Sequence, residues 1–321
     1  MRMGGAFGLL AALFLAGAAW AGQPPPMLIP GAFPTDRQPD GNTIIFEDKN
    51  GLIVVDTGRH KEHQQAILDL ARARGKPIVA IVNTHWHLDH SGGNQELRAV
   101  YPHAKLYTSN AVRGALDHFL ARSLDDARRK LADPAISDAD KAEIRLGYDA
   151  ITDRRDLIPD MPVTDTIRLP YAGHYLELRL APHAATEGDT WIYDSHARIV
   201  VAGDLVVLPL PFFDTACAEG WRQALATIDR TDFAILYPGH GPALSHGELS
   251  LYRLAFDRLL DCAQSDAAKS ACIDGWLRDA GHLLRTDLER KQSRGYLDYY
   301  LDRILRNAKS QQEFCGPAGS R

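Results

Sequence analysis

Two hydrophobic patterns alternate along the chain: short apolar runs typical of buried strands, and longer stretches with apolar residues at helical spacing. Apolar runs at 43–46 and 52–55, joined by a polar turn at 48–51, predict a β-hairpin. Residues 61–73 have helical spacing, and the β-branched run at 78–82 predicts a buried strand. We therefore expect a mixed α/β chain from its first half.

The pattern changes between residues 110 and 160, which are charged, helix-periodic and without a strand signal. We interpret this segment as a helical insertion, serving either as a scaffold or as a lid over a functional site. Strand patterns return in four runs, at 166–169, 175–180, 190–193 and 199–202. From residue 247 to the end the spacing is helical again.

The resulting order is β-rich, helical, β-rich, helical. It predicts two similar halves packed together with their helices outside. The predicted organisation is a signal peptide at 1–21, a linker at 22–40, a domain at 41–246 with the insertion at about 110–160, and a helical C-terminal extension at 247–321.

The first residues have the pattern of a secretory signal. Arg2 is followed by an apolar run at 9–16 and by Ala19-Trp20-Ala21, a small-x-small cleavage pattern. An uncleaved membrane anchor is the competing interpretation, but the apolar run is shorter than the ~20 residues that a spanning helix needs. We therefore expect cleavage after Ala21, a periplasmic or secreted location, and no stable membrane insertion afterwards.

Composition adds two constraints. With 45% hydrophobic and 24% charged residues and a formal net charge of −5, the 321-residue chain is an ordinary globular protein without the basic surface that nucleic acid binding requires. The expected partner is a small-molecule substrate, and the oligomeric state stays open.

All four cysteines lie in the last third of the chain. In an oxidising compartment, an even number favours disulfides over metal binding. Cys262 and Cys272 are close enough in sequence to join two neighbouring helices, which would leave Cys217 with Cys315. Sequence allows three pairings, and this one is our hypothesis.

The strongest chemical signal follows the strand at 78–82, where His85, His87, Asp89 and His90 fall within six residues. A strand that ends in such a turn holds several ligands rigidly. Imidazole suits zinc, and a neighbouring carboxylate can hold a second divalent ion or a water. The alternative is a polar loop that happens to be rich in histidine. Trp86 and Leu88, between the ligands, are expected to pack.

Two further motifs lie at strand ends. Asp204 follows the apolar run 199–202 at a predicted tight turn, and His240 follows 234–237 between two glycines. Glycine there would let the backbone approach a metal closely. Either motif alone is weak, because a buried aspartate in a turn is usually a cap. Together with the histidine turn they predict a metal site.

With these motifs, the chain resembles the metallo-β-lactamase superfamily of metal-dependent hydrolases over roughly residues 40–245. The resemblance implies a four-layer αββα sandwich of the α/β class, with the site at one edge between its two sheets. The helical insertion and the C-terminal extension would be additions to that fold.

The resemblance also implies a role for each motif residue. His85 and His87 match ligands of a first metal, while Asp89, His90 and His240 match ligands of a second. Asp204 matches the carboxylate that bridges both metals, and Asp56, in Val55-Asp56-Thr57-Gly58, matches the aspartate that supports the ligand turn.

One position departs from the family pattern, which places a third imidazole directly before a Thr-x-Gly-Asp-like turn. Here that turn is 186–189, Ala185 precedes it, and the nearest imidazole is His183. In an extended strand His183 would face the same side, but ~6.6 Å further back. Three interpretations follow: a bulge brings His183 to the first metal; that metal is held by His85, His87 and Asp204 with water; or His183 lies outside a site that holds one metal well.

The implied activity is hydrolysis of an ester, lactone, thioester or similar small substrate by a metal-activated water, with Asp89 orienting the water or moving its proton. One or two Zn²⁺ ions per chain are expected, with Fe or Mn as alternatives. A β-lactamase is a second candidate. A third is a metal- or cofactor-binding accessory protein of a periplasmic quinoprotein system, without turnover and with a degenerate first metal site. Residues 203–206 and 212–217 resemble a branch linked to such systems. The pair Phe212 and Phe213 would line a pocket or, as we favour, pack in the core.

Overall fold

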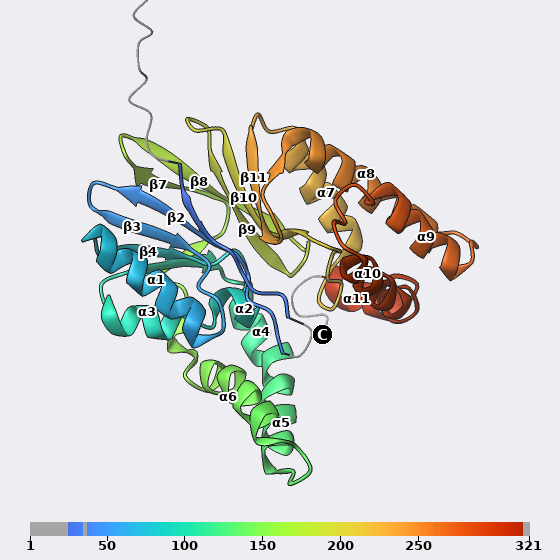
Figure 1. The fold of residues 1–321 in the computed structure, drawn as a ribbon, viewed down its shortest axis with the longest axis horizontal. Helices are drawn as coiled ribbons and strands as arrows, with labels where there is room; N and C mark the ends of the chain where they lie inside the picture. Colours follow the sequence, from blue (N-terminus) through green and yellow to red (C-terminus); the bar gives the residue numbers. More distant parts are fainter. Residues whose placement is uncertain (1–24, 35–36, 317–321) are drawn as a thin grey trace, which may run out of the picture.

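The computed structural model describes residues 25–34 and 37–316, so the predicted signal peptide at 1–21 lies outside the described residues. Two six-stranded sheets face each other and helices cover their outer faces (Figure 1). The predicted four-layer αββα sandwich with a helical C-terminal extension is thus confirmed.

The first sheet contains the N-terminal strands in sequence order: β1 (Met27–Ile29), β2 (Thr43–Asp48), β3 (Gly51–Val55), β4 (Ile78–Val82), β5 (Lys105–Ser109) and β6 (Met161–Val163). β2 and β3 form the predicted antiparallel hairpin, and β3 to β6 run parallel. β1 lies in the segment predicted as a linker. That prediction was wrong here, because a three-residue strand paired with β2 is too short to give a periodic signal.

The second sheet has the order β12-β11-β10-β9-β8-β7. Its strands are β7 (Thr166–Tyr171), β8 (His174–Pro182), β9 (Gly188–Asp194), β10 (Ile199–Val207), β11 (Ile235–His240) and β12 (Leu244–Ser245). All neighbours pair antiparallel except β10 and β11, which are parallel. The parallel pair matters for the site, because it brings two strand ends to the same edge.

Side-chain alternation explains why the central strands of the sandwich are largely apolar. In β2, Ile44 and Phe46 belong to the core between the sheets, whereas Ile45 belongs to the core under the helices α1 (Lys61–Arg74) and α3 (Asn94–Val100). Successive side chains of a strand point to opposite faces, so a strand covered on both sides buries every residue.

The outer face of the second sheet is covered by the helices α7 (Ala218–Asp229) and α8 (His246–Gln264). The chain continues through α9 (Lys269–Asp279), α10 (Asp287–Tyr300), η2 (Leu301–Leu305) and α11 (Ala308–Cys315). Trp221 and Trp276 are fully buried in this core. The C-terminal extension is therefore continuous with the core of the second half.

The insertion comprises α4 (Ala111–Asp117), α5 (Phe119–Ala132), α6 (Asp138–Thr152) and η1 (Arg154–Leu157). α5 and α6 extend away from the sandwich (Figure 1). The base of the insertion packs on Trp86 and Leu88, which are both buried as predicted. A Cβ atom on Gly147 of α6 would lie 3.3 Å from Leu88, so the insertion approaches the ligand turn closely.

Two disulfides join Cys217 to Cys315 and Cys262 to Cys272. This is the pairing that we favoured, and the second bond joins α8 to α9 as expected. Within the described part of the chain, no helix is both long enough and apolar enough to cross a bilayer.

Candidate metal centre

The histidine turn begins where β4 ends. His85 and His87 lie in the loop after this strand, and Asp89 and His90 belong to the short helix α2 (Leu88–Ser91). β4 is a central, buried strand, so the loop starts from a fixed point. The sequence motif therefore keeps its side chains together on one side of the turn.

The remaining predicted ligands come from the second sheet, at the adjacent ends of the parallel strands β10 and β11. Asp204 was predicted at a tight turn, but it lies within β10, beyond a register shift at Gly203. Gly203 has φ +54°, and a Cβ atom there would lie 2.4 Å from Thr84. A Cβ atom on Gly239 would lie 2.0 Å from Asp204 Oδ1, so His240 reaches the site only because glycine precedes it.

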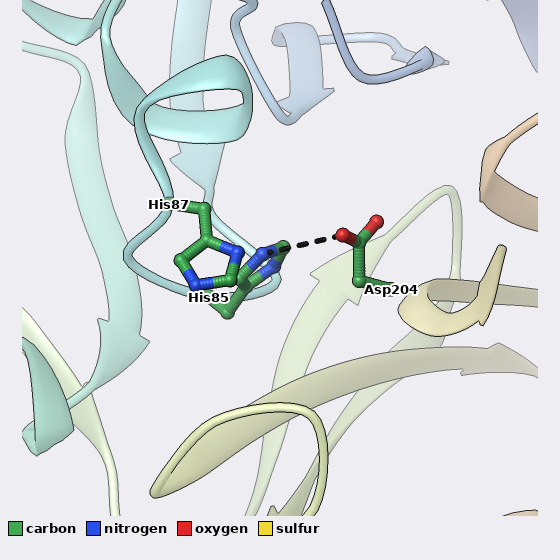
Figure 2. A group of neighbouring side chains, drawn as sticks. All are labelled: His85, His87 and Asp204. Atoms are coloured by element: carbon green, nitrogen blue, oxygen red, sulfur yellow. Dashed lines mark ion pairs between the residues drawn. The ribbon is translucent and has the colours of Figure 1, made fainter. Parts of the chain in front are cut away.

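These six residues form two groups, each with its ligand atoms within 4.8 Å of one another. We call His85, His87 and Asp204 the first ligand set (Figure 2) and Asp89, His90 and His240 the second ligand set.

Asp204 lies between the two sets. Its Oδ2 is 3.7 Å from His85 Nε2, and its Oδ1 is 3.1 Å from His90 Nε2 and 3.6 Å from His240 Nε2. One oxygen faces each set, so this carboxylate could contact cations held by either set.

Two buried atoms of the site have no hydrogen-bond partner among the described residues: His85 Nε2 and Asp204 Oδ1. Unpaired buried polar atoms are costly, so each requires an explanation. Both atoms face the other ligands, and imidazole with carboxylate is a donor set that divalent metals prefer. The residues present therefore fit a divalent metal.

The charges of the site lead to the same conclusion. Burial lowers the pKa of His85 and His87, so both rings are neutral and keep a lone pair. Burial alone would raise the pKa of Asp89 and Asp204, but the His90 charge holds both below the usual range. Burial would also lower the pKa of His90, yet Asp204, Asp89 and Asp56 raise it well above its ordinary value. The carboxylates thus require a positive charge, which a bound cation would supply in place of a proton.

Asp56 is hydrogen-bonded to two residues of the histidine turn. Its Oδ2 accepts hydrogen bonds from His90 Nδ1 (2.8 Å) and from the Thr84 hydroxyl (2.8 Å), and its Oδ1 accepts one from the Thr84 backbone N–H (2.8 Å). The Thr84 hydroxyl gives its proton to Asp56, so it accepts from His85 Nδ1 at 3.0 Å. Both imidazoles are thereby oriented with Nε2 free for a metal. Thr84 belongs to the motif, but sequence reasoning gave it no role.

His183 lies outside both ligand sets, so the bulge that would bring it to the first metal does not form. β8 ends at Pro182, and His183 has φ +49° at the start of a tight turn, with its backbone N–H bonded to the Glu187 carbonyl. The imidazole Nδ1 lies 3.4 Å from the carbonyl oxygen of Phe314. The assumption of an extended strand was wrong, because the chain reverses direction at this residue.

Ala185, in the place of the third imidazole, is buried and contacts the site through its backbone. Its carbonyl accepts a hydrogen bond from the Thr215 hydroxyl, which also contacts His87 Nε2. Thr215 follows the aromatic pair: Phe213 is buried in the core as favoured, whereas Phe212 lines a cavity. Sequence gave no signal for Thr215, because its partners lie more than 25 residues away.

A cavity of about 510 Å³ opens over the ligands. His87, Asp89 and Asp204 form part of its floor, and apolar and aromatic side chains dominate its walls. The walls come from four segments, namely the N-terminal loop, the insertion, the loop between β10 and α7, and α10, and include Phe33, Phe119, Ile144, Tyr148, Phe212 and Tyr296. The insertion therefore forms a wall of the cavity.

A buried imidazole fastens the insertion to the sandwich. His60 Nδ1 lies 2.7 Å from Asp40 Oδ2, and His60 Nε2 lies 3.1 Å from Glu143 Oε2 of α6. Asp40 also accepts hydrogen bonds from the backbone N–H groups of Arg59 and His60. This clasp holds α6 beside the loop that carries Arg59, another residue of the cavity wall.

Comparison with known proteins gives short but clear matches. A hydroxyacylglutathione hydrolase of Synechococcus sp. (strain JA-3-3Ab) is 48% identical over 52 residues, which are 16% of this chain and 21% of that protein. An atrochrysone carboxyl ACP thioesterase of Passalora fulva is 30% identical over 87 residues, 26% of each chain. A linear primary-alkylsulfatase of Pseudomonas sp. (strain ATCC 19151) is 24% identical over 64% of this chain and 42% of that protein. The chain thus spans 21% and 26% of the first two relatives.

Solved structures share the fold. A stereoselective inverting sec-alkylsulfatase from Pseudomonas sp. superposes with a TM-score of 0.54 and 21% identity, covering 87% of this chain and 48% of that one. The DIM-1 metallo-β-lactamase superposes with a TM-score of 0.51 and 14% sequence identity, covering 73% of this chain and 98% of that one. The family model described as metallo-β-lactamase superfamily matches residues 37–261, more than half of the 321 residues. The chain belongs to the metallo-β-lactamase superfamily.

Proposed function

We propose that this protein is a divalent-metal-dependent hydrolase of small esters, thioesters or related substrates, with zinc as the metal. The observation that carries the proposal is the pair of ligand sets around Asp204, in the floor of a cavity large enough for a small molecule. The curated relatives described above are named as hydrolases, which supports the reaction class.

When bound, the metal supplies Lewis-acid activation of water and of the substrate's scissile group. His85, His87 and Asp204 would hold one metal ion, and Asp89, His90 and His240 would hold a second. Asp89 is ionised and lines the cavity, with its Oδ2 3.1 Å from His240 Nε2. It is the carboxylate best situated to orient the attacking water and to accept its proton.

The cavity wall favours a particular kind of substrate. The two arginines in the wall differ, because Arg37 forms an ion pair with Glu62 at 2.6 Å whereas Arg59 forms none with the described residues. Arg59 Nε is buried without a hydrogen-bond partner. We infer that the substrate has an apolar body, which contacts the aromatic walls, and an anionic group that pairs with Arg59.

We also propose that the protein is exported. The two disulfides support this location, because such bonds persist in oxidising compartments. Mass measurement of the protein from a periplasmic fraction should give a chain that starts after Ala21. Recovery of that material with Met1 intact would contradict the proposed cleavage.

The hydrolase proposal is tested by removing and restoring the metal. EDTA-treated protein should lose turnover, and Zn²⁺ should restore it, on a panel of 4-nitrophenyl esters, lactones, thioesters, alkyl sulfates and nitrocefin. Elemental analysis of the same samples gives the metal content. Turnover that is insensitive to metal, or absent from the whole panel in the reloaded protein, would contradict the proposal. Turnover on nitrocefin alone would assign a β-lactamase instead.

A further inference from the structure

Thr215 connects the first ligand set to the position of the missing imidazole. It lies in the loop between β10 and α7 and is 1% exposed. Its Oγ1 is 3.0 Å from the Ala185 carbonyl oxygen and 3.0 Å from His87 Nε2. In the family pattern the residue at position 185 is a histidine. Here only the backbone carbonyl of Ala185 faces this place, and Thr215 connects that carbonyl to His87.

The direction of these hydrogen bonds follows from the number of protons. A threonine hydroxyl has one proton, and a backbone carbonyl only accepts, so the proton of Thr215 goes to Ala185. Oγ1 can then only accept from His87, which must carry its proton on Nε2. In a neutral ring this leaves the lone pair on Nδ1, the nitrogen that remains for a metal.

We propose that Thr215 is a positioning residue that holds His87 as the Nε2–H tautomer, so that its Nδ1 serves the first ligand set. The loss of the third imidazole at position 185 is partly offset, because the two remaining imidazoles of this set are each fixed by a threonine, Thr84 and Thr215. The inference rests on the metal site of the proposed function and is independent of the substrate.

The loop that carries Thr215 is held from both sides. The Cys217 backbone N–H donates to the Ala184 carbonyl (2.9 Å), and Cys217 is disulfide-bonded to Cys315 of α11. Asp214 accepts a hydrogen bond from the Tyr300 hydroxyl of α10 (2.6 Å). Because α10 and α11 belong to the C-terminal extension, this extension fixes the loop from which Thr215 reaches the site.

The test compares Thr215→Val, which keeps the shape and removes the hydroxyl, with Thr215→Ser, which keeps the hydroxyl. Two-bond ¹H–¹⁵N spectra of metal-free, ¹⁵N-histidine-labelled protein report the tautomer of His87. The wild type and Thr215→Ser should contain the Nε2–H form, and Thr215→Val should contain a mixture. Chelator competition should give an affinity for the metal of the first ligand set, which we expect to be the more weakly bound one, that is about 10- to 100-fold lower in Thr215→Val alone.

Binding of the tighter metal is the internal control, because no contact joins Thr215 to the second ligand set among the described residues. Unchanged affinity for this metal in Thr215→Val demonstrates a folded site. The proposal is overturned if that folded variant keeps both the wild-type tautomer and the wild-type affinity for the weaker metal. Neither readout needs turnover, so failure of the hydrolase assignment would be seen separately.

Discussion

The two ligand sets differ in what orients their imidazoles. In the second set, the carboxylate of Asp56 accepts directly from His90. In the first set, neutral hydroxyls accept from His85 and His87. A carboxylate partner makes a stronger hydrogen bond and a more basic imidazole. We therefore expect the second set to bind metal more tightly than the first, although both sets include residues of the same turn.

The largest effect is expected from removing Asp204, the carboxylate that lies between the two sets. Asp204→Ala should reduce both metal affinities and lower kcat/KM by roughly a thousandfold or more, since several kcal/mol of charge stabilisation disappear. Elemental analysis and steady-state kinetics measure the two effects. Full metal content in a folded Asp204→Ala protein would show that the sets are independent. Asp165→Ala is the matched control, because this exposed carboxylate lies outside both ligand sets and outside the cavity.

The next largest effect is expected from Asp56. Asp56→Ala removes the direct partner of His90 and, through Thr84, the support of His85, so it should weaken the tighter metal by about 10- to 100-fold and the other one less. Metal affinities from chelator competition provide the measurement.

Thr84→Val separates the support of His85 from the support of His90. It removes the hydroxyl that orients His85 but leaves the contact between Asp56 and His90 in place. It should therefore weaken only the less tightly bound metal. If both variants weakened the binding of the two metals equally, the proposed difference between the ligand sets would be wrong.

The six ligands themselves could be predicted from sequence. His85, His87, Asp89 and His90 occur in one local motif, and strand patterns indicate Asp204 and His240 near the ends of neighbouring strands. These features depend on residues adjacent in the chain, which a pattern records directly. The αββα fold could be predicted for the same reason.

The first ligand set depends on contacts between distant residues. The reversal at His183 is a single positive φ at a non-glycine residue, which carries no compositional signal. The contacts of Thr215 join segments that are far apart in the chain. The clasp of His60 with Glu143 likewise requires the insertion to be folded back against the sandwich. None of these pairs can be recognised without the tertiary structure.

A smaller effect is expected from Arg59, which lies in the cavity wall with Asp89. Arg59→Gln should lower kcat/KM about tenfold for an ester with an anionic group, through loss of one charge-assisted hydrogen bond, and should leave a neutral ester of the same length unchanged. 4-Nitrophenyl hemiglutarate and 4-nitrophenyl valerate form a suitable pair. Equal losses on both esters would exclude recognition of an anion by Arg59.

The smallest effect on turnover is expected at Asp189, which stabilises the turn that carries Ala185. Its carboxylate accepts hydrogen bonds from the Thr186 backbone N–H (2.9 Å) and hydroxyl (3.2 Å), and burial raises its pKa to about 8. The folded protein therefore keeps a proton that the unfolded chain loses above about pH 4. This contribution to stability is complete below the unfolded pKa and is lost as the pH rises toward 8, by at most about 1.4 kcal/mol per pH unit.

Asp189→Asn removes the titrating group while keeping an oxygen acceptor for Thr186. In the metal-free proteins, the unfolding free energy of the wild type should therefore fall relative to that of the variant as the pH rises from 5 to 8. Above pH 8 the difference between the two should be constant. Urea denaturation at several pH values measures this difference. A difference that does not vary with pH would mean that Asp189 is ionised in the folded protein. In that case the turn beneath the first ligand set would carry a negative charge, and the weaker metal would be held by electrostatic attraction as well as by its ligands.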